Sequence, residues 1–326
     1  MIYVVKYGLL TYRMENIGDE IQSIAARQFL PRVDVYVERD SLNKVVSDEK
    51  IKLIMNGWFT HKPENWPPSP DIEPLFISFH ITPSAAHQLT SPQSIKYFKQ
   101  HEPIGCRDYY TVNLLKKKGV DAYFSGCLTL TLQNTIKKRS NEILLVDIDL
   151  EDKDIIEYLP RQLIQEASFI TRSSVSPNVK KMRELLQYKY RMLYHIIRRI
   201  HVNYAALRFL AFLAKMRCGE KKLQEAEELL KRYMQAKLVI TSRLHGALPC
   251  LAFGTPVIFV RKDLNDPRFK GYIEYLQAYS LDEFKQKCYE IKWDSKFKNP
   301  NSGKLEYLKK DMIRRVKAFV KDEPIQ

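Results

Sequence analysis

The sequence has few cysteines and no close cysteine pair. Its 326 residues include five cysteines, an odd number, and none of them belongs to a C-x-x-C motif. Disulfide frameworks and cysteine zinc sites both depend on paired cysteines. The pattern therefore favours a reduced protein, and we expect a cytoplasmic location.

Long apolar runs are also missing. No stretch approaches the ~18 uninterrupted apolar residues of a membrane-spanning helix. The first ten residues, MIYVVKYGLL, have no basic start and no small-residue cleavage site, and Lys6 interrupts their apolar run. This segment predicts a β-strand rather than a signal peptide. We expect a soluble protein that can still sit on a membrane surface.

Motifs for metals, nucleoside triphosphates and nucleic acids do not occur. The sequence has no HExxH, no cluster of acidic residues and no GxxxxGK[ST] phosphate loop. It has neither zinc-knuckle spacing nor an RNP-type aromatic motif, so a nucleic-acid partner is not expected. We expect no metal and no bound cofactor.

Acidic residues are fewer than basic ones. The chain has 38 Asp and Glu against 53 Lys and Arg, a formal net charge of +15. Such a surface attracts phosphates, carboxylates or acidic lipids. The charge is uneven, because Glu184 is the only acid between Lys180 and Arg217. This basic helical segment, at about 178–220, fits either two solvated helices packed on a sheet or contact with an anionic leaflet, where each basic residue contributes roughly 1 kcal/mol.

What is present is the pattern of an α/β protein. With 45% hydrophobic residues, the chain can build two medium domains. Apolar, β-branched runs alternate with amphipathic stretches, which predicts parallel sheets covered by helices. Helices are expected at Glu20 to Phe29 and at Tyr109 to Lys118, the second ending on Gly119. The expected strands are residues 2–7, 33–37, 51–55, 75–79, 104–106, 122–124, 143–148, 168–171, 238–241 and 257–260.

A polar stretch at residues 133–141 separates the two series of strands. We therefore place an N-terminal Rossmann-like domain at 1–138 and a C-terminal one at 139–326. In open α/β sheets, ligands bind beyond the carboxyl ends of the strands. The active site is expected in the cleft between the domains.

The most informative segment is LVITSRLHGALPCLAFGTPV, residues 238–257. Its strand stops at Thr241 and a helix begins near Leu244, so Ser242, Arg243 and His245 fall on the turn. Such a turn binds anions through backbone N–H groups and the helix dipole, and Arg243 adds a planar charged fork. The alternative is that Arg243 and His245 only cap or brace the turn.

This block resembles the C-terminal signature of the polysaccharide pyruvyltransferase family. Further matches occur in the expected order, from about Asn16 to about Phe269: NIGDE at 16–20, NGWF at 56–59, GCRDYYT at 105–111 and SGCLTLT at 125–131. The resemblance implies two Rossmann-like domains in a GT-B-like arrangement, and transfer of pyruvate from phosphoenolpyruvate to a sugar of a surface or extracellular polysaccharide precursor. Two departures are Asn56-Gly57 in place of a Gly-rich turn and a longer basic insertion before Leu223.

The resemblance also implies a donor site and a mechanism. The donor site takes Ser242, Arg243, Leu244 and Gly246, and an arginine suits the phosphate and carboxylate of phosphoenolpyruvate. Protonation of the methylene carbon precedes attack by a sugar hydroxyl, and His245 is the expected general acid. Phosphoenolpyruvate is then a co-substrate, and the acceptor is a free sugar or a lipid-linked oligosaccharide at the inner face of the cytoplasmic membrane.

The remaining candidates stand at other strand ends. Asp19 is expected to hold sugar hydroxyls or act as a base, or else to cap a helix. Arg107 and Arg172 are expected donor contacts, although Arg107 could instead pair with Asp108. The acceptor side is expected to include Asn16, Gly18, Asn56, Trp58 and His80, although His80 fits a buried, hydrogen-bonded position equally.

Two rival functions remain at this point. A GT-B glycosyltransferase using a nucleotide sugar would have the same architecture and cleft. A non-catalytic protein that binds a membrane surface or a polymer through the basic segment would show no turnover.

Overall fold

The computed structural model describes residues 5–13, 16–148, 153–170, 219–291, 293, 299–300 and 302–324. Arg172, and the basic segment at about 178–220 except its last two residues, lie outside the described residues. None of the helices in the described ranges is long and apolar enough to cross a membrane.

The first half of the chain forms a six-stranded sheet in the order β2-β1-β3-β4-β5-β6, in which every neighbouring pair is parallel. The strands are β1 (Lys6–Thr11), β2 (Val35–Glu38), β3 (Ile51–Phe59), β4 (Ile72–Ile81), β5 (Ile104–Cys106) and β6 (Ala122–Phe124). The α-helices are α1 (Gly18–Arg27), α2 (Ala86–Leu89), α3 (Pro92–Lys99) and α4 (Tyr109–Lys116). Asp108 caps α4 by accepting a hydrogen bond from the Thr111 N–H, which fixes where this helix leaves β5.

The second half forms a five-stranded parallel sheet in the order β11-β10-β9-β7-β8. Its strands are β7 (Ile143–Val146), β8 (Ala167–Ile170), β9 (Leu238–Thr241), β10 (Val257–Arg261) and β11 (Gln277–Ser280). Its α-helices are α5 (Lys153–Ile156), α6 (Arg161–Glu166), α9 (Gly219–Gln235), α10 (Leu244–Phe253) and α11 (Leu281–Lys287). Short 3₁₀ helices lie at Arg39–Lys44, Pro63–Asn65, Pro83–Ala85, Leu128–Thr131 and Ile273–Tyr275. Gly254 ends α10 with φ of 66°, the left-handed conformation that glycine adopts without strain.

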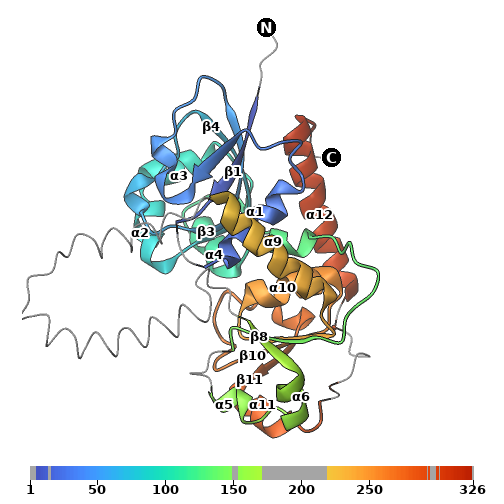
Figure 1. The fold of residues 1–326 in the computed structure, drawn as a ribbon. Coiled ribbons are helices and arrows are strands. Elements are labelled where there is room, and N and C mark those ends of the chain that lie inside the picture. Colours follow the sequence, from blue (N-terminus) through green and yellow to red (C-terminus); the bar gives the residue numbers. More distant parts are fainter. Residues whose placement is uncertain are drawn as a thin grey trace, which may run out of the picture.

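The two sheets share packing at their junction, where α1, α9 and α10 lie between them (Figure 1). One hydrophobic cluster runs from Ile21 and Ala25 of α1 to Leu230 of α9 and Leu248 of α10. The last helix, α12 (Ser302–Lys321), returns to the first sheet, where Lys52 donates a hydrogen bond from Nζ to the Phe319 carbonyl at 2.8 Å. The junction is therefore a packed core and not a flexible tether.

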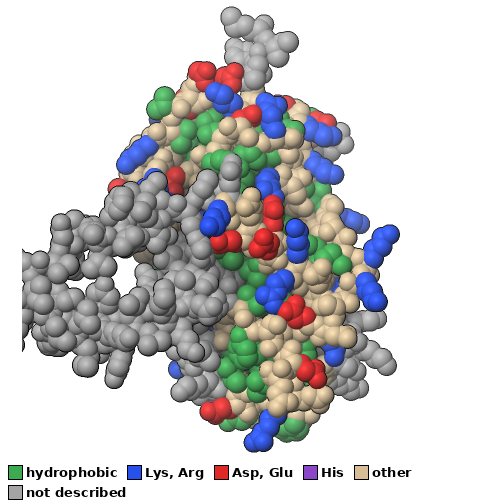
Figure 2. Space-filling model, viewed as in Figure 1, with side chains coloured by type: hydrophobic (Ala, Val, Ile, Leu, Met, Phe, Trp, Pro, Cys, Tyr) green, Lys and Arg blue, Asp and Glu red, His purple; other side chains and the backbone are tan. Residues whose placement is uncertain are grey.

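Acidic and basic side chains are mixed over the face that carries α9 and α12 (Figure 2). Ion pairs also occur within α12, where Arg314 contacts Asp311 at 2.7 Å.

The structure confirms the predicted α/β class with two parallel sheets. The strands expected at 104–106, 122–124 and 238–241 have the observed bounds. β1 was expected at 2–7 but extends to Thr11, because Leu9 and Leu10 are buried in the core at 1% exposure each. β11 was not predicted, since Gln277–Ser280 is short and has no apolar run. The domain boundary at residue 138 stays a prediction; in the structure it lies between β6 and β7.

Candidate active site

Residues that follow the strands of both sheets line a cavity of about 290 Å³. Because both sheets are parallel, their strands present carboxyl ends, where loops bring polar side chains together. The sequence predicted seven of its lining residues: Asn16, Asp19, Trp58, Arg107, Arg243, Leu244 and His245. The other lining residues are His61, Cys127, Leu248, Arg261, Arg268, Phe269 and Tyr272. We call this the active cavity.

The turn between β9 and α10 forms one wall of the active cavity. Arg243 stands at the N-cap in extended conformation, with φ of −119° and ψ of 135°, and its side chain does not cap the helix. The positive end of the α10 dipole therefore lies at the cavity, beside Arg243 and His245. Ser242 supports the turn from behind, since its Oγ donates a hydrogen bond to the Asp147 carbonyl at 2.9 Å.

Gly246 permits this turn to pack tightly. A Cβ atom added there would lie 2.6 Å from Thr241 Oγ1, closer than real Cβ contacts allow. Gly246 and Ser242 thus shape the turn, and neither is among the residues that line the cavity.

Four arginines line the active cavity: Arg107, Arg243, Arg261 and Arg268. Asp266 holds Arg268 through contacts to Nε at 2.9 and 3.0 Å. Arg261 donates from a terminal nitrogen to the Ser242 carbonyl at 3.0 Å and lies over the Phe269 ring. Among the described residues that line the cavity, Asp19 supplies the one carboxylate, so the wall is strongly positive and suits a multiply charged anion.

His245 lies on the first turn of α10, facing the 3₁₀ segment of the first half. Its Nε2 is 3.9 Å from Cys127 Sγ, and Thr129 Oγ1 donates to the same sulfur at 3.2 Å. Histidine titrates near neutrality, so an imidazole in this place can carry a proton to a bound ligand.

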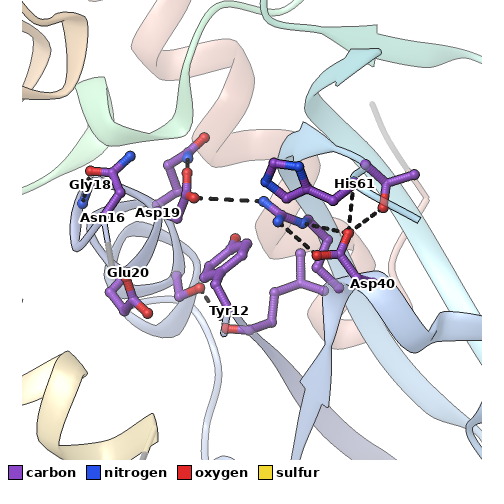
Figure 3. A network of polar contacts seen from close by, with 12 residues as sticks. Tyr12, Asn16, Gly18, Asp19, Glu20, Asp40 and His61 are labelled. Atoms are coloured by element: carbon purple, nitrogen blue, oxygen red, sulfur yellow. Dashed lines mark hydrogen bonds and ion pairs between the residues drawn. The ribbon is translucent and has the colours of Figure 1, made fainter. Parts of the chain in front are cut away.

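Asp19 lies on the opposite wall and is held from two sides (Figure 3). Gln22 Nε2 donates to Asp19 Oδ1 at 3.1 Å, and Arg39 lies 3.6 Å from Oδ2. Asp19 is not a helix cap, because the N-cap of α1 is Ile17. The amide of Gln22 in turn accepts a hydrogen bond from Arg107 at 2.9 Å, which links this wall to the arginines.

Arg39 organises the same wall through its contacts with two carboxylates. Its side chain has no exposed surface, and its guanidinium lies 4.8 Å from both the Tyr12 and the Trp58 ring centroids. It pairs with Asp40, whose Oδ1 accepts the His61 backbone N–H at 3.0 Å. Arg39 therefore fixes Asp19, Trp58 and the loop of His61 together.

Gly18 and Asn16 form the turn that leads into α1. The Gly18 N–H donates to Asn16 Oδ1 at 3.1 Å (Figure 3). Asn56 is buried and not among the lining residues, and its Nδ2 donates to the Gln22 carbonyl at 2.8 Å. It braces α1 against β3.

His80 is also buried and is not among the lining residues. Its Nδ1 lies 2.6 Å from Asp108 Oδ2. Burial lowers the pKa of His80. At Asp108 burial alone would raise the pKa, but the hydrogen bond and charge of His80, the charge of Arg107 and the Thr111 N–H together lower it. Both lowered pKa values fit a neutral His80 imidazole that donates from Nδ1 to a charged Asp108 carboxylate. Because Asp108 caps α4, His80 acts here as a structural partner of that helix.

A metal site is not found in the described residues, where no group of three His, Cys, Asp or Glu side chains converges. The charge at the active cavity comes from arginine and a helix terminus. The arrangement suits an organic anion.

The sequence comparison identifies the family. A family model described as polysaccharide pyruvyl transferase matches residues 16–263, which is more than half of the chain and includes every described residue of the turn before α10. The chain belongs to the polysaccharide pyruvyl transferase family. No curated protein matches it significantly.

Solved structures with a similar fold are distant in sequence from this pyruvyl transferase family member. A putative UDP-N-acetylglucosamine 2-epimerase from Listeria monocytogenes is 10% identical, with 100% of this chain and 99% of that chain covered and a TM-score of 0.50. A structure of S. aureus MnaA with UDP is 9% identical, with 98% of both chains covered and a TM-score of 0.45. The likeness to the Listeria protein shows the fold alone, and the predicted GT-B-like arrangement of two Rossmann-like units is confirmed.

Sequence reasoning missed several residues of the active cavity in this family member. Arg261 closes β10, and extending the predicted strand by one residue would have reached it. Arg39, which does not line the cavity but holds Asp19 in its wall, was missed as well; it follows β2 directly, at the carboxyl end of the strand. His61, Arg268 and Tyr272 gave no such signal, because they lie in loops whose paths depend on packing.

Proposed function

We propose that the protein transfers pyruvate from phosphoenolpyruvate to two hydroxyls of one sugar and forms a cyclic ketal. One observation carries the proposal: four arginines and the N-terminus of α10 border the same cavity as His245, Asp19 and Trp58. Phosphoenolpyruvate is a small anion charged at both its phosphate and its carboxylate. Trp58 offers a ring face to the acceptor sugar on the other side.

The reaction needs a proton at the donor carbon first. His245 gives its proton to the methylene carbon, which leaves a cationic centre at the carbon that bears the phosphate. One sugar hydroxyl attacks that centre and passes its proton to Asp19. Phosphate then leaves with the electrons of its C–O bond and takes the proton from Asp19, the second hydroxyl closes the ketal, and its proton returns to His245. Arg243 and its neighbours hold the charged groups throughout.

We propose that no cofactor takes part and that the enzyme works in the cytoplasm, where its acceptor is a free or lipid-linked saccharide precursor. The four described cysteines, Cys106, Cys127, Cys250 and Cys288, are free and buried, which supports a reducing compartment.

A transfer assay tests the proposal. The protein is incubated with phosphoenolpyruvate and a panel of free and lipid-linked saccharides, and phosphate release and product mass are measured. We expect phosphate release that depends on acceptor and a product that carries a pyruvate ketal. Release of a nucleoside diphosphate from a nucleotide sugar would instead identify a glycosyltransferase. Vesicle or polymer binding without turnover of any donor would identify a non-catalytic protein.

A further inference from the structure

A second cavity, of about 790 Å³, lies on the far side of the loop that borders the active cavity. One wall is α4, with Tyr109, Asn113 and Lys117, and the other is the 264–273 loop, with Asn265, Asp266 and Lys270. We call it the α4 cavity. It shares no lining residue with the active cavity, and nothing in the proposed reaction uses it.

The 264–273 loop joins the two cavities. Asp266 lines the α4 cavity and holds Arg268, which lines the active cavity. The Tyr272 hydroxyl donates to the Arg107 carbonyl at 2.5 Å, which ties the loop to the segment that leads into α4. The two cavities therefore lie on either side of the Asp266–Arg268 ion pair.

The volumes of the two cavities can be compared with the size of the proposed ligands. Ligand pockets span about 300–1,000 Å³. The active cavity, at about 290 Å³, can take a small donor and the reacting sugar, but not the rest of a polysaccharide precursor. The α4 cavity has the volume for several further sugar units.

The lining of the α4 cavity suits saccharides. Tyr109 stacks on Phe124 at 4.6 Å between ring centroids and 16° between planes, and it is 40% exposed, so its other face is open. An open aromatic face packs against the C–H face of a sugar ring. Asn113, Asn265 and the two lysines supply donors and acceptors for hydroxyl groups.

We propose that the α4 cavity binds the sugar units that follow the reacting sugar of the acceptor. The proposal rests on the proposed pyruvyl transfer only for the identity of the reacting sugar. The cavity gives the enzyme a preference for oligosaccharides over single sugars. Contacts with Tyr109, Asn113 and Lys117 account for the higher affinity of the oligosaccharide.

Binding measurements test this without turnover. An array of glucose-, galactose- and mannose-based saccharides of one to six units identifies the strongest binder, and calorimetry then measures its affinity and that of its one-unit fragment. We expect affinity to rise with length in the wild type. Asn113→Ala and Lys117→Ala should each weaken the long saccharide about fivefold and leave the single sugar unchanged.

Lys116→Ala is the matched control, since it removes the same charge from an exposed neighbouring position of α4 outside the cavity. Tyr109→Ala is a third variant, which should also weaken binding of the long saccharide. If loss of the contact with Phe124 unfolds the Tyr109→Ala protein, the Asn113→Ala and Lys117→Ala variants still give the test. Affinity that is independent of length, or a length effect that survives in the Asn113→Ala/Lys117→Ala double variant, would overturn the proposal. Length-dependent binding that these variants abolish, in a protein that does not use phosphoenolpyruvate, would support the α4 cavity and count against the proposed reaction alone.

Discussion

Arg243 differs from the other arginines of the active cavity in its place in the fold. It stands at the N-cap of α10, so its guanidinium and the positive end of the helix dipole lie at the same cavity. This position makes Arg243 the first choice for a contact with a carboxylate or phosphate of the proposed donor.

Arg243→Ala should weaken phosphoenolpyruvate binding about 10- to 100-fold, because a hydrogen-bonded charge contact is lost while three arginines remain. Arg243→Lys should recover only part of the affinity, since a point charge does not reproduce a bidentate fork. Titration calorimetry with phosphoenolpyruvate measures both. Lys262→Ala, an exposed residue outside the active cavity, controls for net charge. Wild-type affinity in Arg243→Ala would remove this residue from the donor site.

His245→Gln should lower turnover by roughly 100-fold or more while donor affinity falls much less. Glutamine keeps much of the shape and hydrogen bonding of histidine but carries no transferable proton. Turnover is measured per folded enzyme, with the folded fraction taken from circular dichroism. His87→Gln, at an exposed position of α2, is the control. Near-normal turnover in a well-folded His245→Gln protein would exclude it as the general acid.

Arg39→Ala should lower the free energy of unfolding by about 3–5 kcal/mol, because the variant leaves Asp40 largely buried without its partner. Arg13→Ala is the matched control: Arg13 also pairs with a carboxylate, but its side chain is 83% exposed. An exposed pair contributes about 0–1 kcal/mol. Urea unfolding of both variants gives the comparison, and equal losses would show that the buried Arg39 pair contributes no more to stability than an exposed one.

Among the helices and strands, the pattern of apolar residues predicted the bounds of those strands whose position depends on burial in the core. β5 and β9 were located to the residue because every one of their residues is buried and a polar turn follows each. β6 was located as well, although it is an edge strand with two half-buried residues. β11 was missed because its four residues are only half-buried, so a sheet edge and not a hydrophobic run holds it in place. A strand that is held mainly by hydrogen bonds to a neighbouring strand leaves no such pattern of apolar residues in its own sequence.

The contact between α1 and α9 contains a buried ion pair at the junction of the sheets. Lys222 Nζ donates to the Tyr12 carbonyl at 2.7 Å and lies 3.3 Å from Glu20 Oε1, while Glu20 Oε2 has no hydrogen-bond partner among the described residues. Burial raises the pKa of Glu20 to about 7, against the opposing charge of Lys222 and with a further contribution from Asp19.

A raised pKa means that the folded protein binds this proton more tightly than the unfolded chain does. The resulting stability is fully present below about pH 4.5 and is lost as the pH rises through about 7. Relative to Glu20→Gln, the wild type should therefore lose on the order of 2 kcal/mol of unfolding free energy between about pH 5 and pH 8. Urea unfolding across this range measures it. Glu228→Gln, exposed on α9, is the control, and parallel pH profiles for wild type and Glu20→Gln would contradict the prediction.

At the scale of the whole molecule, the site depends on contacts that no single segment encodes. The turn of Arg243 and His245 was predictable because strand, turn and helix are consecutive in the sequence. The contact between Arg39 and Trp58, and the loop that brings Arg268 and Tyr272 to Arg107, join residues far apart in the chain. Sequence order carries no signal for such pairs, so the turn before α10 was found and half of the residues that line the cavity were not.

The net charge of +15 is also a property of the whole chain, and it leads to a prediction about membranes. Both signs are mixed on the α9 and α12 face (Figure 2), whereas the sequence from Lys180 to Arg217 has a single acid. We expect the protein to bind vesicles containing anionic lipid, and to release them as salt rises from about 0.1 M to 1 M, because the screening length falls from about 10 Å to 3 Å. Co-sedimentation measures the bound fraction.

Two triple variants locate the contact. Binding should be abolished in the variant Lys180→Glu/Lys181→Glu/Arg183→Glu. Most of it should remain in the variant Lys116→Glu/Lys117→Glu/Lys118→Glu, which makes the same change in net charge on α4 and the turn after it. Equal binding to neutral and anionic vesicles, or equal loss in the two triple variants, would show that the segment is a solvated surface and not a membrane contact.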